Sequence, residues 1–366
     1  MKAGSNLQEL EQMVRGELEI KNDFNCDSRD LAFRIKPVGE AEFFKPVIEL
    51  DGTDYETSEL MNNQIANKLN VPKKYFDRMV TEAPELCEQN VNHWLQEDPK
   101  RYMVRTLGNK ARAFLSDRYE VIDNWDVLKA IMPALRPYKE KDDLEFEESH
   151  ITDTNLYLRF TIPSLEKDIA VHTNEGDGKK VGDIIHFGLQ VKNSEVGLGS
   201  VEVAPFIKRL VCLNGMVATD YGQNKKHLGR SQWDGIDRSI LRQETIKQGN
   251  KAWIMTVQDS VDGMFNGPIF EEISNTFVEA QTGTKMDVPR RSIEKLTKDF
   301  DFSESESDSI LEHLLGSGDK TKFGLANAVT RTATDVENVD RSMKMESQGW
   351  QIMNMKFDQW YNYATA

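Results

Sequence analysis

The segment RYMVRTLGNKARAFLSDRY, residues 101–119, constrains the fold of this chain more strongly than any other stretch. Two runs of alternating hydrophobic and polar residues flank the pair Gly108-Asn109, which is typical of a two-residue turn between antiparallel strands. The segment therefore predicts a β-hairpin in which residue 107 faces residue 110 and residue 105 faces residue 112.

Further strands are expected around residues 154–163 and 183–193. In the second segment Ile185, Phe187, Leu189 and Val191 occupy every other position, which indicates a strand with one buried face. From about residue 236 onward, the hydrophobic spacing is helical instead. Strands and helices are thus segregated along the chain, and the alternation expected of a parallel sheet does not occur.

This order predicts an α+β fold with an antiparallel sheet core, helices packed on the sheet, and a helical C-terminal third. We expect residues 1–55 to form an N-terminal arm with a short helix and strands. Residues 56–232 would form the α+β core domain, and residues 233–366 the helical C-terminal region. A chain of 366 residues is long enough for one large domain or two ordinary ones.

A helix, a break at Asn70-Val71-Pro72 and a second helix are expected between residues 57 and 79. The second helix begins PKKYFDRM, and its two lysines could meet phosphates. A DNA-reading helix-turn-helix would have this order, but a packed helical hairpin has it too and is far commoner. The pattern therefore favours the packed hairpin.

The predicted hairpin carries an unusual concentration of positive charge. Residues 100–118 contain six Lys and Arg residues against the single acid Asp117, although the whole chain has a net charge of −15. The regular pairing places Arg105 opposite Arg112, and like charges that face each other across a ladder destabilise it. The same face presents Phe114. Guanidinium groups that bind phosphates and a ring that stacks on a base are what single-stranded nucleic acid requires.

The sequence therefore indicates a nucleic-acid-binding face on the hairpin, consisting of Arg101, Arg105, Lys110, Arg112, Phe114 and Arg118. Two alternatives remain open. Some of the 61 acidic residues could fold over this face and form ion pairs with it. A helix could also cover Phe114, which would make both faces of the hairpin part of the core.

A second basic cluster follows the strand region. It comprises Lys208, Arg209, Lys225, Lys226 and Arg230, and between residues 205 and 232 only Asp220 opposes it. A phosphate-binding surface and a solvated loop explain this cluster equally well.

No motif predicts a catalytic residue, a cofactor or a metal. The segment GSGDKT at 316–321 lacks the glycine that a phosphate-binding loop needs before its lysine, and the six histidines show no metal-binding spacing. Three scattered cysteines suit a reducing cytoplasm, and no apolar run approaches the ~20 residues that span a bilayer. We therefore expect a cytoplasmic protein with no membrane partner.

Three segments carry a family resemblance: RAFLSDRYEVIDNWDVL at 112–128, NSEVGLGSVEVAPFIKRLVCLNGMV at 193–217 and FGLANAVTRTA at 323–333. Together they resemble the phage/plasmid-like proteins that contain domain of unknown function 932. The resemblance extends from about Leu60 to the C-terminal helices. It implies a mobile-element origin and a host cytoplasm, but no established activity and no catalytic residue.

These observations lead to three hypotheses about function. The first is a DNA-associated accessory protein of recombination or replication that binds or anneals single strands, by analogy with annealing proteins that assemble into homo-oligomers. The second is a protein-interaction or anti-defence factor that binds a host or phage protein and no nucleic acid. The third is an enzyme whose site is assembled from residues far apart in the sequence.

Overall fold

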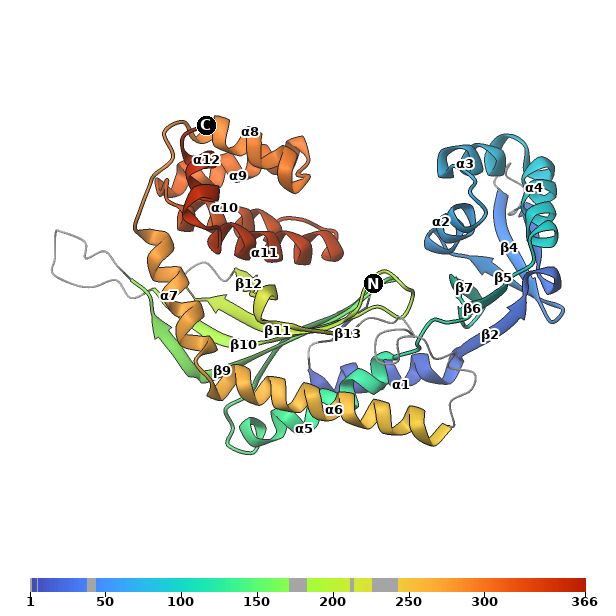
Figure 1. Cartoon of the computed structure of the whole chain (residues 1–366), viewed down its shortest axis with the longest axis horizontal. Helices are drawn as coiled ribbons and strands as arrows, with labels where there is room; N and C mark the ends of the chain where they lie inside the picture. The colour runs from blue at the N-terminus through green and yellow to red at the C-terminus, as the bar shows by residue number, and fades with distance from the viewer. Residues whose placement is uncertain (1, 5, 38–43, 171–182, 211–213, 226–242) are drawn as a thin grey trace.

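The computed structural model describes residues 2–4, 6–37, 44–170, 183–210, 214–225 and 243–366. Two β-sheets organise the chain, and helices pack on both (Figure 1). We call the seven-stranded sheet at the centre sheet A and the six-stranded sheet of the N-terminal half sheet B. The predicted α+β class is confirmed, because most strand pairs are antiparallel and the C-terminal third is helical.

Sheet A is antiparallel throughout. Its spatial order is β1 (Lys2–Gly4), β8 (Glu145–Ile151), β9 (Leu156–Asp168), β10 (Ile184–Asn193), β11 (Val201–Arg209) and β12 (Gly215–Val217), with β13 (Gln223–Lys225) also paired to β11. The alternation predicted in β10 is confirmed, since Ile185, Phe187, Leu189 and Val191 are all fully buried. They share one core with residues of α1 (Leu7–Ile20), α5 (Asn124–Lys139) and α6 (Gln243–Asn266).

The other face of sheet A is largely polar and is covered in part by one of the C-terminal helices (Figure 1). The C-terminal helices are α7 (Ile269–Gln281), α8 (Pro289–Phe300), α9 (Glu304–Ser317), α10 (Lys322–Thr334), α11 (Val339–Met353) and α12 (Phe357–Ala364). Arg159 of β9 forms a buried ion pair with Glu346 of α11, and its guanidinium lies 4.6 Å from the centre of the Phe206 ring. The charged residue is thus compensated where α11 covers the sheet.

Sheet B contains the predicted hairpin. Its spatial order is β2 (Lys21–Asp27), β6 (Arg101–Leu107), β7 (Lys110–Ser116), β5 (Thr53–Thr57), β4 (Phe44–Leu50) and β3 (Ala32–Pro37), and only the β5–β7 pair is parallel. Three helices pack on it: α2 (Glu59–Lys68), α3 (Lys73–Glu82) and α4 (Pro84–Glu97). Ser58 caps α2 by accepting a hydrogen bond from the Met61 N–H at 3.1 Å. The predicted break between α2 and α3 is present, and Asn70 adopts a positive φ of 55° there.

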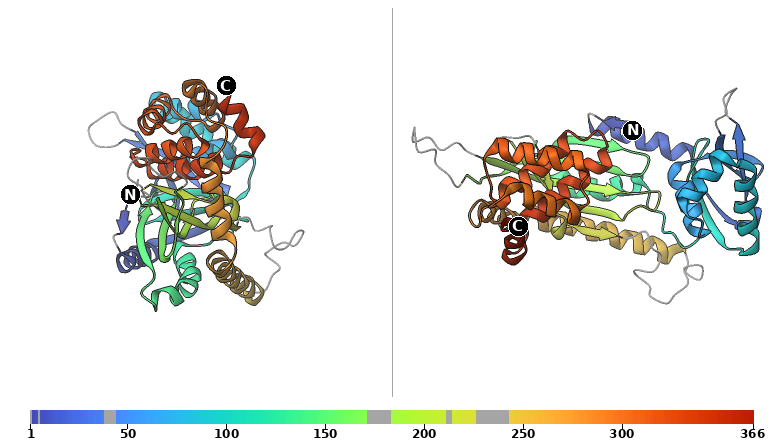
Figure 2. Two further views of the ribbon diagram at one scale, coloured as in Figure 1. Left: turned by 90° about the vertical axis from the view of Figure 1, so that its left-hand side faces the viewer. Right: turned by 90° about the horizontal axis from the view of Figure 1, so that it is seen from above.

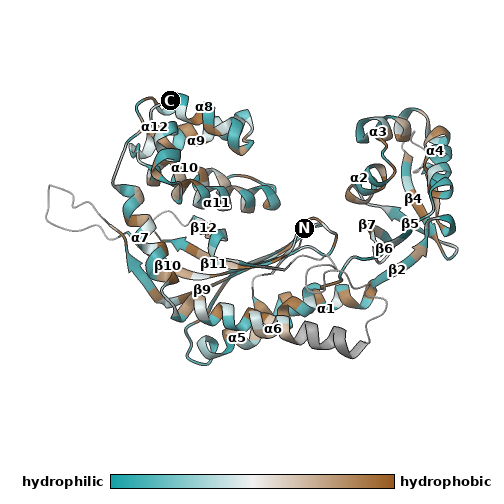
Figure 3. Ribbon diagram, viewed as in Figure 1, coloured by the Kyte–Doolittle hydropathy of each residue, from teal (hydrophilic) through white to brown (hydrophobic). Residues whose placement is uncertain are grey.

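Sheet B and α2–α4 form an N-terminal lobe. Here the structure differs from the predicted domain organisation, because the expected boundary between residues 55 and 56 falls inside β5 and the arm's strands belong to the same sheet as the hairpin. The N-terminal lobe and the C-terminal helices stand at opposite ends of the molecule, on the same side of sheet A (Figures 1 and 2). The helices are banded in hydrophilic and hydrophobic colours, as expected when one face is buried (Figure 3). Among the described residues, no helix is long and apolar enough to cross a membrane.

Candidate functional site

The β6–β7 hairpin begins with the predicted register and then departs from it. Leu107 pairs with Lys110, as expected, but the register shifts between Arg105 and Thr106, so that Arg105 faces Ala113. The predicted opposition of Arg105 and Arg112 is therefore wrong. A β-bulge places two residues of one strand against one of the other, and it redirects every side chain beyond it.

Arg105 is fully buried, and each of its three guanidinium nitrogens donates at least one hydrogen bond within the chain. Nε lies 2.7 Å from a carboxylate oxygen of Asp23, Nη2 lies 2.6 Å from Asp123, and Nη1 donates to the backbone carbonyl of Glu195 at 2.8 Å. Burial lowers the pKa of Arg105, but the carboxylates of Asp23 and Asp123 outweigh burial and raise the pKa above its ordinary value. An arginine with these partners has no free group for a phosphate, which removes Arg105 from the proposed binding face.

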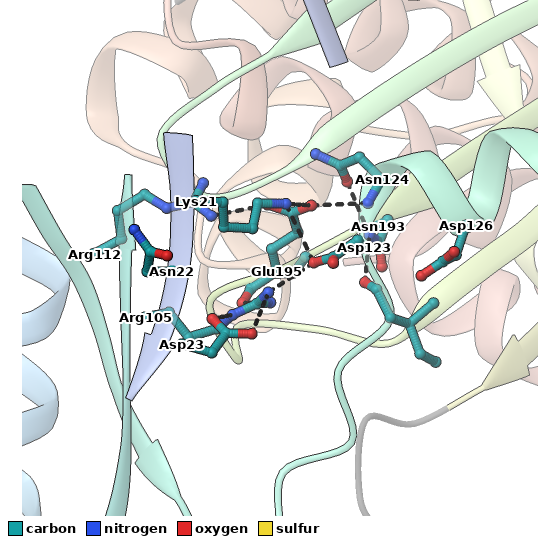
Figure 4. A network of polar contacts seen from close by, with 12 residues as sticks. Lys21, Asn22, Asp23, Arg105, Arg112, Asp123, Asn124, Asp126, Asn193 and Glu195 are labelled. Atoms are coloured by element: carbon teal, nitrogen blue, oxygen red, sulfur yellow. Dashed lines mark hydrogen bonds and ion pairs between the residues drawn. The ribbon is translucent and has the colours of Figure 1, made fainter. Parts of the chain in front are cut away.

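Glu195, in the loop after β10, compensates the other cations of the hairpin face. Its carboxylate lies 2.5 Å from the ammonium group of Lys21 and 2.9 Å from Arg112, and it also accepts the backbone N–H of Asn124 at 2.8 Å (Figure 4). Burial, the largest single effect, raises the pKa of Glu195. The charges of Lys21 and Arg112 oppose it, and the resulting pKa is lowered from 4.5 to about 2.

We call Lys21, Asp23, Arg105, Arg112, Asp123 and Glu195 the Glu195 cluster. Its three cations face three carboxylates, so the cluster is balanced by charge. Its members come from both sides of the junction between the sheets: from β2, β6 and β7 of sheet B, and from the segments that lead into α5 and out of β10 (Figure 4). The hairpin's inner charges therefore hold the two sheets together and leave no demand for an external anion.

Phe114 also lies in the core. Its side chain is fully buried, and its ring centre lies 4.3 Å from that of Tyr102 within the core of the N-terminal lobe. The prediction that Phe114 stacks on a base is contradicted, because the ring has no accessible surface. The alternative in which both faces of the hairpin are core describes this part of the molecule.

Three predicted residues of the hairpin remain exposed: Arg101, Lys110 and Arg118. Lys110 follows the turn. Arg101 and Arg118 lie together at the opposite, open end of the hairpin, because Tyr102 pairs with Ser116 and each arginine is within two residues of that pair. The structure thus brings two of the predicted cations together and places the third at the far end of the strands.

Of the second basic cluster, the structure describes only Lys208, Arg209 and Lys225. Lys208 forms an ion pair with Glu147, and Arg209 pairs with Asp183 at 2.6 Å with its guanidinium 5.0 Å from the centre of the Phe323 ring. Lys225 ends strand β13, while Lys226 and Arg230 lie outside the described residues. Lys208 and Arg209 are compensated internally, so the structure favours a structural role for them over phosphate binding.

A pocket of about 400 Å³ opens beside the open end of the hairpin. The turn between α2 and α3, one face of α4 and the start of β6 enclose it. Two large aromatic side chains line it with substantial exposure, Tyr75 at 46% and Trp94 at 45%. Its lining is Lys68, Leu69, Asn70, Val71, Pro72, Tyr75, Asn90, Trp94, Asp98, Lys100 and Tyr102.

Lys68 is the most unusual group in this pocket. Its ammonium group lies 5.4 Å from the centre of the Tyr102 ring, and it forms no ion pair with the described carboxylates. Burial lowers its pKa, and Asp117 only partly opposes that effect. Lys100, by contrast, pairs with Asp98. A half-buried cation without a direct counterion is a site at which an anion is stabilised.

This pocket was not predicted from the sequence. One pattern in the sequence could have indicated the exposed Trp94. The residues Cys87, Val91 and Leu95 form the buried face of α4, and Trp94 lies outside that face. A tryptophan just outside a complete apolar stripe indicates an exposed ring.

The described residues contain no group of three His, Cys, Asp or Glu side chains that could hold a metal ion. No family model, curated protein or solved structure matches the chain.

Proposed function

We propose that this protein binds single-stranded nucleic acid at the open end of the β6–β7 hairpin. One observation carries the proposal: the exposed Arg101 and Arg118 lie at the same end of the hairpin as the pocket that exposes Tyr75 and Trp94. The proposal keeps the chemistry expected for the hairpin but moves it from the face of the ladder to its end.

Cations beside exposed aromatic rings suit a single strand for two physical reasons. Guanidinium and ammonium groups bind phosphates and release condensed counterions, which gives affinity without regard to sequence. Exposed rings stack on unpaired bases, at about 1–3 kcal/mol per base. The bases of a duplex are already stacked and cannot use such rings, so the combination favours a single strand over a duplex.

The biological role is part of the same proposal. The accessory role in recombination or replication of a mobile element rests on the expected resemblance of residues 112–128, 193–217 and 323–333 to phage/plasmid-like proteins, for which no family model gives a match. Single strands are exposed in both processes, and both take place in the host cytoplasm, where we place the protein.

Fluorescence anisotropy with labelled oligonucleotides tests the proposal. The double variant Arg101→Glu with Arg118→Glu should weaken binding at least about tenfold at about 50 mM salt. It should also flatten the dependence of affinity on salt, since each lost phosphate contact contributes a slope of about 0.7 for single strands. The matched control reverses Arg290 and Arg291, which are exposed on α8, and should bind as the wild type does.

Absence of binding to any single strand at low salt would overturn the proposal. Capture of a host protein that survives nuclease treatment, with no nucleic acid recovered, would favour the protein-interaction hypothesis in its place.

A further inference from the structure

The pocket beside the open end of the hairpin holds two polar groups that lack a direct partner among the described residues. Lys68 has no ion pair with a described carboxylate, and the buried side-chain oxygen of Asn90 has no hydrogen-bond partner within the described part of the chain. Buried polar groups in folded proteins almost always have partners. Of these two groups, Lys68 is partly accessible and can take a counterion from a ligand, whereas the Asn90 oxygen has no accessible surface and lies beyond a ligand's reach.

The same pocket exposes apolar ring surface that the fold could have buried. Tyr75 comes from α3 and Trp94 from α4, and nearly half of each side chain remains accessible. Single hydrophobic residues are common on convex protein surfaces, but exposed rings that line a pocket are typical of binding sites for flat ligands. The ligand should thus combine a planar ring with a negative charge.

We infer that this pocket binds one nucleotide unit, with the base against the rings of Trp94 and Tyr75 and the phosphate beside Lys68. The inference rests on the proposed function and names the part of the strand that the pocket takes. A volume of about 400 Å³ lies in the range of pockets that enclose a single small ligand. A strand that contacts Arg101 would pass around the end of β6 to place one base in the pocket, because Arg101 and the pocket residue Tyr102 point to opposite faces of sheet B.

The electrostatics of the lining favour an anionic ring over a neutral or cationic one. Among the lining residues, Lys68 and Lys100 face one carboxylate, Asp98, which already pairs with Lys100, while Asp117 outside the lining acts on Lys68 without a direct ion pair. A neutral aromatic ligand would desolvate Lys68 further without compensation, and a bare anion would leave both rings exposed. Only a ligand with both parts satisfies the whole pocket.

Isothermal titration of the full chain with adenosine 5′-monophosphate, adenosine and ribose 5-phosphate separates these contributions. We expect the monophosphate to bind, and adenosine and ribose 5-phosphate each to bind at least about tenfold more weakly. Trp94→Ala and Lys68→Gln should each weaken the monophosphate about tenfold, in line with the loss of one stacking or charged contact. The matched controls are Tyr361→Ala, on α12, and Lys344→Gln, on α11, which replace exposed residues at the other end of the molecule.

Equal affinities for adenosine and its monophosphate would overturn the assignment of the phosphate to Lys68. If oligonucleotides bind in an Arg101- and Arg118-dependent manner but the monophosphate does not bind, the pocket inference fails and the proposed function stands. If the monophosphate binds in a Trp94-dependent manner and no oligonucleotide binds, the pocket inference stands and the proposed binding of single-stranded nucleic acid is overturned. Because Trp94 and Lys68 are partly exposed, thermal melts of the variants should match the wild type and exclude unfolding as the cause.

Discussion

The carboxylate of Glu195 lies 2.5 Å from the ammonium group of Lys21, and this contact joins the loop after β10 of sheet A to the first residue of β2 in sheet B. Both side chains are nearly inaccessible to solvent, at 3% and 6% exposure. A complete buried ion pair adds little stability compared with apolar packing. Removing one partner is costly, because the other charge then stays buried in surroundings of low polarity without a counterion. The Glu195 cluster is therefore sensitive to the loss of any one charge.

Replacing Glu195 with Gln should destabilise the protein by about 3 kcal/mol, because buried Arg112 would lose its counterion and Lys21 would keep only Asp123, at 3.2 Å. Urea unfolding followed by circular dichroism and tryptophan fluorescence measures this change. The matched control is Glu49→Gln, which breaks the exposed pair with Arg34 at 2.8 Å and should cost less than about 1 kcal/mol. Equal losses for the two variants would show that the cluster is not buried as described.

The same residue predicts a dependence of stability on acid. Because the pKa of Glu195 falls from 4.5 to about 2 on folding, the unfolded chain binds this proton more readily than the folded one. The stabilisation is thus complete above about pH 5 and is lost as the pH falls towards 2. The difference in unfolding free energy between the wild type and Glu195→Gln should shrink by roughly 3 kcal/mol over this range, and other carboxylates cancel because both proteins contain them. A constant difference from pH 5 to pH 2 would contradict the lowered pKa.

Local patterns in the sequence were sufficient for the strands β6, β7, β9 and β10 and for several helix ends. The alternation of Ile185, Phe187, Leu189 and Val191 identifies the buried face of β10 because side chains of a strand point to opposite faces in turn. Ser58 and the Asn70-Val71-Pro72 break locate α2 and α3 for equally local reasons. The helix α5 differs, since it continues through Pro133 and Pro137 although a proline inside a helix removes a backbone hydrogen bond.

Partners far apart in the sequence could not be predicted. Arg105 meets Asp23 and Glu195, which are separated from it by 82 and 90 positions, and no periodic signal connects them. The bulge beside Arg105 also has no reliable mark in a single sequence, so a regular ladder was the natural assumption. The pocket beside the open end of the hairpin could not be predicted for the same reason, because α2, α3, α4 and β6 meet there only in the folded chain.

Phe114 and the exposed arginines should separate stability from binding. Phe114→Leu should lower the unfolding free energy by about 1 kcal/mol through imperfect packing against Tyr102, while oligonucleotide affinity at 25 °C stays at the wild-type value. The variant with Arg101→Glu and Arg118→Glu should show the reverse, with weaker binding and unchanged stability. Urea unfolding and fluorescence anisotropy, measured on both variants, compare the two effects. A large loss of oligonucleotide affinity in folded Phe114→Leu would show that Phe114 takes part in binding.

Gly188 should be the glycine of sheet A least tolerant of substitution. A Cβ atom at this position of β10 would collide with the backbone carbonyl oxygen of Phe160 on the paired strand β9, and neither backbone can move without breaking the ladder. Gly188→Ala should therefore destabilise the protein by at least about 3 kcal/mol. If the variant does not fold at all, no soluble protein should be obtained on expression. The matched control is Gly16→Ala in α1, where nothing lies within 4 Å of the added atom. That change should stabilise the helix by about 0.5–1 kcal/mol, since alanine loses less backbone freedom on folding than glycine. A Gly188→Ala variant that unfolds at the wild-type urea concentration would contradict the close approach of β9 and β10.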